Sequence, residues 1–218
     1  PELAPVVENL MAAWVDIERQ QTPFNVIAMD PNDDSAEIEL KNNIWLRAFK
    51  TDHTSRSLGY VIYEKRSKLL EEFVGLPQDK LVDLKKQGTT ITRTLHIPLV
   101  AYLGDTAVGD HLLREDVCQA KILITECTFF DKGHRERARV GKHLHVSDLG
   151  PWLEKVEAEA IVLTHLSRRT VLNKARNELK EHLPEQMCER IHFLMDSRTN
   201  RARYQRQKAE AEQQQAEA

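Results

Sequence analysis

The sequence predicts an α/β fold in which a β-sheet is layered between helices. Residues 36–105 are rich in short segments that alternate apolar and polar side chains, the pattern of half-buried strands. Residues 120–196 instead alternate short apolar runs with helical patterns, which favours a layered α/β domain. No apolar run is long enough to cross a membrane, so the sequence predicts no membrane span.

The first half of the chain is predicted to be mainly β. A helix is predicted over residues 1–20, where Val6, Leu10, Ala13 and Val15 recur at helical spacing. The other segments are a hairpin over 36–53 that turns at Lys-Asn-Asn, a strand over 57–65, two helices over 68–88 broken at Gly-Leu-Pro, and strands over 89–98 and 99–106.

The second half is predicted to alternate strands and helices. The strands cover residues 120–130, 160–167 and 190–196, and the helices cover 147–158 and 170–183. Ser147 or Asp148 is the expected N-cap of the first of these helices. We divide the chain into one domain over residues 1–196 and a low-complexity charged tail over 197–218, which is disordered or a frayed, solvated helix.

Composition limits the compartment and the partners. The 31 Lys and Arg residues against 34 Asp and Glu residues give a net charge of −3, which argues against a general nucleic-acid coat but allows a local basic patch. The three cysteines are odd in number and lack metal-site spacing, so we expect reduced thiols. The first twenty residues carry acids and lack a signal-peptide pattern, so a cytoplasmic location is predicted.

Four predicted strands each end on a side chain that can bind a metal or move a proton. These side chains are His53, Asp105, Glu126 and His165, and His143 adds a fifth just before a predicted helix. Loops past strand ends are where α/β proteins build their sites. Taken singly, each has an ordinary interpretation, such as a turn aspartate or a core histidine. Together, imidazoles and carboxylates are the ligands of a hydrolytic zinc site.

The remaining histidines are interpreted as structural. His145 stands beside His143 and is either an orienting group behind a ligand or a structural residue, and the structural interpretation is favoured. The others are His96, His111, His134, His182 and His192.

At this point the chain resembles a known family. The segments FKTDHTSRSLGYVIYEKRSKL, VGLPQDKLVDLKKQGTTIT, YLGDT, TECTF, GKHLHVSDL and IVLTHLSRR follow in order the pattern of ribonuclease Z. This family comprises tRNA 3′-end endonucleases of the metallo-β-lactamase superfamily, and the likeness over about residues 1–169 is to its short plant and cyanobacterial types. The resemblance implies a metallo-β-lactamase-like αββα sandwich, two zinc ions, precursor tRNA as partner and a homodimer.

The resemblance also implies a set of metal ligands. His53, in a His-(x)5-Gly-Tyr pattern, resembles the ligand of the first zinc. Asp105 of GDT resembles the aspartate that bridges both zincs, and His165 of LTHLSRR resembles a ligand of the second.

A proton-donating pair is implied in the same way. Glu126 matches the glutamate of the His-Glu-Ala-Thr motif, with Thr125 in place of its histidine. His143 resembles the histidine that works with this glutamate to protonate the leaving 3′ oxygen, because its distance to His165 fits the family spacing. The letters after His145 fit the His-Ser-Thr motif better, so both histidines remain candidates.

The chain departs from the family pattern near its start. The motif His-x-His-x-Asp-His precedes the position of His53 in the family, and no histidine precedes His53 here. With a first residue of Pro1, we expect this chain to be the carboxyl-terminal portion of a longer protein, with the first metal motif and the N-terminal strands absent. As it stands it would hold three metal ligands and would be incomplete for activity.

Two segments are candidates for contact with RNA. The family's long arm is replaced by a short, lysine-bearing stretch before Gly88, which is equally well interpreted as a solvated connection. The segment DKGHRERARVGKH places several cations before His143, and Arg168 and Arg169 follow His165. The alternative is a surface helix whose charge is balanced by Glu136. The cations favoured for phosphate contact are Arg135, Arg137, Arg139, Lys142 and Arg169.

The leading hypothesis is a zinc-dependent endoribonuclease that removes the 3′ trailer of precursor tRNA. A second is another hydrolase of the same fold that acts on small phosphodiesters or esters, because a fold does not fix a substrate. A third is a non-catalytic binding module that has kept the sheet and lost the metal centre.

Overall fold

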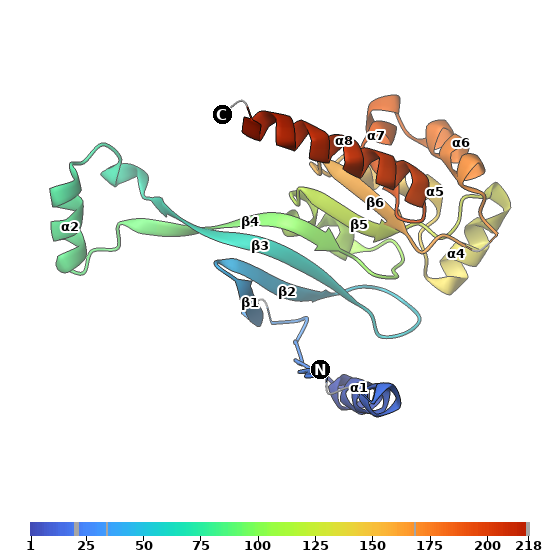
Figure 1. Cartoon of the computed structure of the whole chain (residues 1–218), viewed down its shortest axis with the longest axis horizontal. Helices are drawn as coiled ribbons and strands as arrows, with labels where there is room; N and C mark the ends of the chain where they lie inside the picture. Colours follow the sequence, from blue (N-terminus) through green and yellow to red (C-terminus); the bar gives the residue numbers. More distant parts are fainter. Residues whose placement is uncertain (20–21, 34, 168, 217–218) are drawn as a thin grey trace.

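The computed structural model describes residues 1–19, 22–33, 35–167 and 169–216. These residues form one seven-stranded sheet whose strands lie in chain order. Figure 1 labels β1 to β6 of this sheet. The strands are β1 Glu37–Lys41, β2 Ile44–Lys50, β3 Leu58–Leu69, β4 Thr92–Tyr102, β5 Ile122–Glu126, β6 Ala160–Thr164 and β7 Ile191–Phe193. Neighbours from β1 to β4 are antiparallel, and those from β4 to β7 are parallel. The predicted α/β class is confirmed.

Eight α-helices lie among the described residues, and those near residues 147–158 and 170–183 confirm the helices predicted for the second half of the chain. They are α1 Ala4–Glu18, α2 Gln78–Lys86, α3 Glu115–Cys118, α4 Arg135–Gly141, α5 Val146–Leu153, α6 Leu172–His182, α7 Glu185–Glu189 and α8 Ser197–Ala216. The tail from Ser197 is helical, which is the second of the two forms expected for it.

The first hairpin forms where the alternating pattern places it. Asn42 and Asn43 both have positive φ, 43° and 67°, as the central residues of a type I′ turn require. Asparagine tolerates this conformation better than most residues, so the Lys-Asn-Asn sequence fixes the register of β1 on β2.

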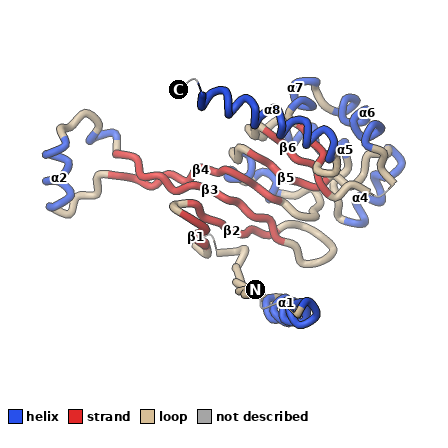
Figure 2. The backbone as a smooth tube through the Cα atoms, in the orientation of Figure 1, coloured by secondary structure: helices blue, strands red, loops and turns tan. Residues whose placement is uncertain are grey.

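A two-stranded arm projects from the sheet and carries α2 at its tip (Figures 1 and 2). β2 pairs with β3 as far as Glu64, and beyond it Lys65–Leu69 pair with β4 alone. The helix predicted before Gly75 is therefore wrong: Lys68 and Leu69 continue the strand, and only a 3-10 turn at Glu71–Phe73 remains. Pairing with β4 outweighs the helical preference of this Lys- and Glu-rich stretch.

β4 is also one strand where the sequence predicts two. Pro98 interrupts the pattern, but it lies at a register shift between Ile62 and Tyr63 of β3. A β-bulge can accept proline without losing the strand, because one residue there does not have to donate to the ladder.

The core lies on one face of the sheet. Leu123, Ile161 and Leu163 of β5 and β6 are fully buried, and Leu149 and Trp152 of α5 belong to the same cluster. The side chains that alternate with them on the strands are less covered, since Tyr102 and Ile122 are 42% and 39% exposed. The described residues thus supply one sheet layer and one helical layer.

Gly59 has a steric reason to be glycine. It lies directly opposite Phe49 on β2, and a Cβ built on it would come within 2.3 Å of the Phe49 ring. Phe49 is itself 2% exposed, so the ring has little room to move. Gly59, the glycine of the His-(x)5-Gly-Tyr pattern, therefore leaves space for the ring of Phe49 in the core.

Candidate active site

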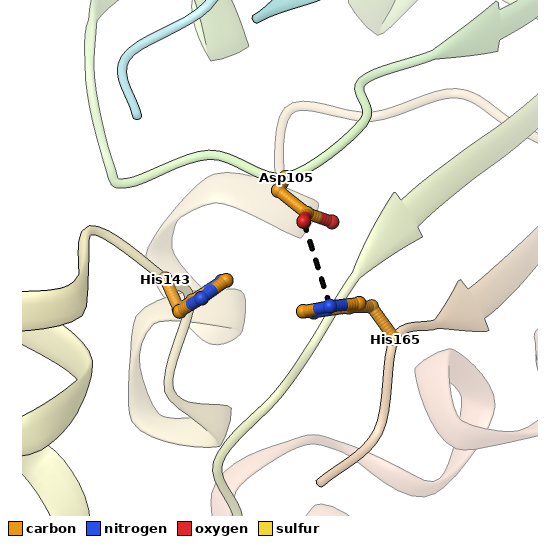
Figure 3. A group of neighbouring side chains, drawn as sticks. All are labelled: Asp105, His143 and His165. Carbon is orange, nitrogen blue, oxygen red and sulfur yellow. Dashed lines mark ion pairs between the residues drawn. The ribbon is translucent and has the colours of Figure 1, made fainter. Parts of the chain in front are cut away.

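The candidate site lies past the carboxyl ends of β4, β5 and β6. Figure 3 shows Asp105, His143 and His165, each of which offers one ligand atom within 4.8 Å of the others. Asp105 follows β4 and Gly104, whose φ of 63° turns the chain, and His165 follows β6 directly. Parallel neighbouring strands end at one edge of a sheet, so these two side chains meet there.

Asp105 and His165 fit a metal ion by chemistry and by distance, and His143 lies beside them. Imidazole nitrogens and a carboxylate are the donors that zinc takes in hydrolytic sites, and two donors of one ion lie at most about 4 Å apart. His165 Nε2 lies 3.4 Å from Asp105 Oδ2, and the ring of His143 stacks on that of His165 with centroids 5.0 Å apart.

A buried carboxylate orients His143. Glu126, the last residue of β5, is fully buried, and its Oε1 accepts from His143 Nδ1 at 2.7 Å and from the Thr106 amide at 2.8 Å. Its Oε2 accepts from the Thr128 hydroxyl at 2.6 Å and the Leu144 amide at 3.3 Å. Because Nδ1 is engaged by the carboxylate, Nε2 is the nitrogen of the His143 ring that is left for the site.

His53 lies beside this group rather than within it. Its ring centroid is 4.9 Å from that of His143, and its Nδ1 donates to the Lys142 carbonyl at 3.1 Å. This bond leaves Nε2 as the acceptor nitrogen of a neutral ring. The group that the structure brings closest together thus contains His143, whereas the sequence pattern proposes His53, Asp105 and His165 as the ligands.

His145 is occupied elsewhere. Its Nε2 donates to the Asp131 carbonyl at 3.0 Å, and its Nδ1 accepts from the Ser147 amide at 3.2 Å. Asp148 accepts in return from the His145 amide, so His145 is the N-cap of α5. The prediction that Ser147 or Asp148 is the N-cap is wrong. These residues are the second and third of α5, and Asp148 forms the capping box with His145. This geometry supports the structural interpretation of His145.

The cations predicted to contact RNA lie around the site with partners of their own. Lys142 Nζ lies 2.7 Å from Asp52, and Arg139 pairs with Glu136 through both of its carboxylate oxygens. Arg135 lies 3.9 Å from Asp148. The charge of Arg139 is therefore balanced by Glu136, as the alternative interpretation of this segment proposes.

Arg137 and Arg169 are placed differently. Arg137 lies over the ring of Phe129 at 5.5 Å, and this ring meets His143 edge-on at 6.1 Å. Arg169 is exposed four residues past His165. Arg168 lies outside the described residues.

Two threonines complete the site, and the sequence reasoning missed both. Thr106 holds the Asp105 loop, because its amide donates to Glu126 and its hydroxyl contacts His111 Nε2 at 2.7 Å. Burial lowers the pKa of His111, which favours its neutral form. Thr128 Oγ1 lies 2.9 Å from His165 Nδ1. The only signal for Thr128 is its place two residues after Glu126 in TECTF.

Several curated proteins similar to the chain are named tRNase Z or ribonuclease Z. No family model matches it. It is 32% identical over 192 residues to tRNase Z TRZ1 of Arabidopsis thaliana, covering 86% of this chain and 67% of that protein. It is 36% identical over 142 residues to the chloroplastic tRNase Z TRZ2 of the same plant, covering 63% and 40%. Ribonuclease Z of Saccharolobus solfataricus is 30% identical over 167 residues, covering 68% and 53%.

Solved structures give more distant likenesses. The metallo-β-lactamase fold protein YhfI of Bacillus subtilis is 18% identical with a TM-score of 0.49, covering 82% of this chain and 58% of that one. The short form of human tRNase Z is 18% identical with a TM-score of 0.47, covering 75% and 59%.

The chain matches only part of the length of each of these relatives. The chain spans two thirds of the length of tRNase Z TRZ1 and about half or less of the other curated relatives named here. Among the described residues, no helix is both long enough and apolar enough to cross a membrane. With nearly a third of the aligned residues identical to tRNase Z TRZ1 across two thirds of that protein, the chain belongs to the ribonuclease Z family.

Proposed function

We propose that the protein is a zinc-dependent endoribonuclease that removes the 3′ trailer of precursor tRNA. The observation that carries the proposal is the meeting of Asp105, His143 and His165 at one sheet edge, with the buried Glu126 behind His143. Such a group has ligands for a metal and a separate route for a proton, as hydrolysis of a phosphodiester needs.

Asp105 and His165 would hold zinc in this proposal, and His53 would be the ligand of a first ion with Asp105 between the two. Two zinc ions supply Lewis acidity and a water molecule of lowered pKa at neutral pH. The protein's part is to fix the ligands. Gly104 turns Asp105 toward the site, and the Lys142 carbonyl holds His53 by Nδ1 so that Nε2 is the available donor.

Glu126 and His143 form the proton-donating pair. Glu126 is removed from water and accepts from Nδ1, so it stabilises a positive charge on the ring and fixes its orientation. A proton on Nε2 then points into the site, where the leaving 3′ oxygen of the tRNA would accept it. In this proposal Glu126 acts on the substrate only through the ring of His143.

The RNA phosphates would meet the cations around His143. Arg137 lies over the ring of Phe129, which meets the ring of His143 edge-on. Arg135, Arg139, Lys142 and Arg169 surround the same edge and would exchange their present partners for phosphate oxygens.

The function is tested on the protein made from its complete reading frame. We expect a single cut of a precursor tRNA at the 3′ end of the mature sequence, with a 3′-hydroxyl on the tRNA. A chelator should abolish the cut and zinc should restore it, with about two zinc ions bound per chain. A product with a 3′ phosphate, cuts at many positions, or metal-independent cleavage would contradict the proposal.

The protein is further proposed to be a homodimer joined through α1. No residue of this helix is buried, and Val6, Leu10, Trp14 and Ile17 follow one side of it at helical spacing. Leu10 and Ile17 are 66% and 77% exposed. An apolar stripe of this kind is stabilised when a second copy covers it.

Charges on this stripe should separate the dimer. The double substitution Leu10→Glu and Ile17→Glu places carboxylates in the proposed interface, and sedimentation velocity should show a shift from dimer to monomer. Ala12→Glu adds one carboxylate on the opposite side of α1 and should leave the dimer intact, whereas each single variant, Leu10→Glu or Ile17→Glu, should not. An unchanged sedimentation coefficient in the double variant would exclude α1 as the interface.

We also propose a cytoplasmic location. Cys118, Cys127 and Cys188 all carry free thiols, which suits a reducing compartment.

A further inference from the structure

The hydroxyl of Thr128 joins the two histidines of the site. Thr128 Oγ1 lies 2.6 Å from Glu126 Oε2, 2.9 Å from His165 Nδ1 and 3.0 Å from the His165 carbonyl oxygen. It also lies 3.4 Å from His143 Nδ1. Thr128 follows β5 and is 6% exposed, so these groups, rather than water, are its partners.

A hydroxyl has one proton, which limits these contacts. Glu126 can only accept, and its bond to Thr128 is the shortest and is assisted by the charge of the carboxylate. The Thr128 proton therefore points to Glu126 in preference to the His165 carbonyl. The lone pairs of Oγ1 are then free to accept, and the partner that can donate to them is the Nδ1–H of His165.

This arrangement determines which nitrogen of His165 faces the site. With the proton on Nδ1, Nε2 carries the lone pair, and it points at Asp105 Oδ2, which also carries lone pairs, at 3.4 Å. Two acceptors that face each other are stabilised by a cation between them. The metal-ready tautomer of His165 is thus favoured by a hydroxyl on the far side of its ring.

His165 has particular need of this support. Its side chain is 47% exposed, and its backbone has φ of 53°, a left-handed conformation that is costly for a non-glycine residue. Without a fixed partner, its ring would be free to turn and to exchange tautomers in water. Thr128 contacts both the ring and the carbonyl of His165.

We propose that Thr128 is a positioning residue that relays the buried Glu126 carboxylate to His165. Glu126 then orients His143 directly and His165 through one hydroxyl, so a single buried charge sets the tautomers of both rings. This role rests on the proposed hydrolase site for its purpose, but it is a property of the metal-free chain.

The test compares two threonines of the same β-strand region. Thr128→Val removes the hydroxyl and keeps the shape. Thr125→Val is the matched control, because Thr125 is also buried but its hydroxyl donates to the Glu126 backbone carbonyl and touches neither histidine. Thr128→Ser keeps the hydroxyl and should behave as the wild type. If the valine variant does not fold, judged by circular dichroism, Thr128→Ala carries the same expectation.

The first readout is the tautomer of His165 in the metal-free chain. Long-range ¹H–¹⁵N NMR of histidine-labelled protein at about pH 8.5, where histidine is ordinarily neutral, distinguishes Nδ1–H from Nε2–H. We expect Nδ1–H in the wild type, in Thr125→Val and in Thr128→Ser. In Thr128→Val we expect a mixture or a switch to Nε2–H.

The second readout is zinc affinity in competition with a chromophoric chelator. Thr128→Val should bind zinc about 10–100-fold more weakly than Thr125→Val, the usual effect of removing a group that orients a ligand. An unchanged tautomer in Thr128→Val, or an equal loss in Thr125→Val, would overturn the relay. Failure to cleave precursor tRNA would instead overturn the proposed function and leave the NMR result standing.

Discussion

Replacement of His165 by alanine is expected to abolish cleavage of precursor tRNA and to reduce the zinc content. The substitution removes one of three donors that lie within 4.8 Å of one another and leaves Asp105 without the nitrogen that faces it. Loss of a ligand removes several kcal/mol of charge stabilisation in the transition state. We therefore expect kcat/KM to fall by about 10³-fold or more. Steady-state kinetics and metal analysis of the same preparation measure both effects.

His192→Ala is the control for this substitution. His192 lies on β7 and is partly buried like a typical structural histidine, and none of its described contacts reaches Asp105 or His143. It should keep the zinc content and most of the activity. Equal kinetics for His165→Ala and the wild type would exclude His165 as a metal ligand.

Glu126→Gln is expected to damage both catalysis and stability. The carboxylate accepts from four donors, and a glutamine side chain turns one acceptor into a donor that faces N–H or O–H groups. Each buried group left without a partner costs about 1–3 kcal/mol of unfolding free energy. The ring of His143 also loses the charge that stabilises its protonated form, so cleavage should fall by about 10²–10⁴-fold. Urea denaturation and single-turnover kinetics test the two effects.

His143→Ala separates the effect on catalysis from the effect on stability. It removes the proton donor but leaves the other three donors on Glu126, and the side chain of His143 is 17% exposed rather than fully buried. We expect a similar loss of cleavage with a smaller loss of stability. A Glu126→Gln variant that cleaves as fast as the wild type would show that the pair does not donate the proton.

The sequence predicts the body of the sheet well because its strands carry their own signal. β5 and β6 are short apolar runs that end in a polar group, and the Asn42–Asn43 turn has the chemistry that its dihedral angles require. In the arm, the strand over residues 89–98 and the helix at the tip are predicted, and only the helix expected before Gly75 is wrong, because the residues that end β3 are largely charged and exposed. There, pairing between β3 and β4 determines the structure, and this pairing is invisible in a local window.

The site is predictable in outline for a similar reason. Strand ends that follow apolar runs place Asp105, Glu126 and His165 at one edge, and this needs only the rule for parallel strands. The contact of Thr128 with His165 joins residues 37 positions apart and depends on side-chain geometry. The cap at His145 was missed because histidine is rarely the residue expected there.

The order of the strands in the sheet has a consequence for how the chain is assembled. From β1 to β7, every strand lies beside the strand that precedes it in the sequence. Chains emerge from the ribosome amino-terminus first, so each new strand meets an edge that is already in place. Within the described residues, no strand has to be inserted between two earlier ones. Asp105 and His165 are consequently brought together late, when β6 is added to an edge that β5 has already formed.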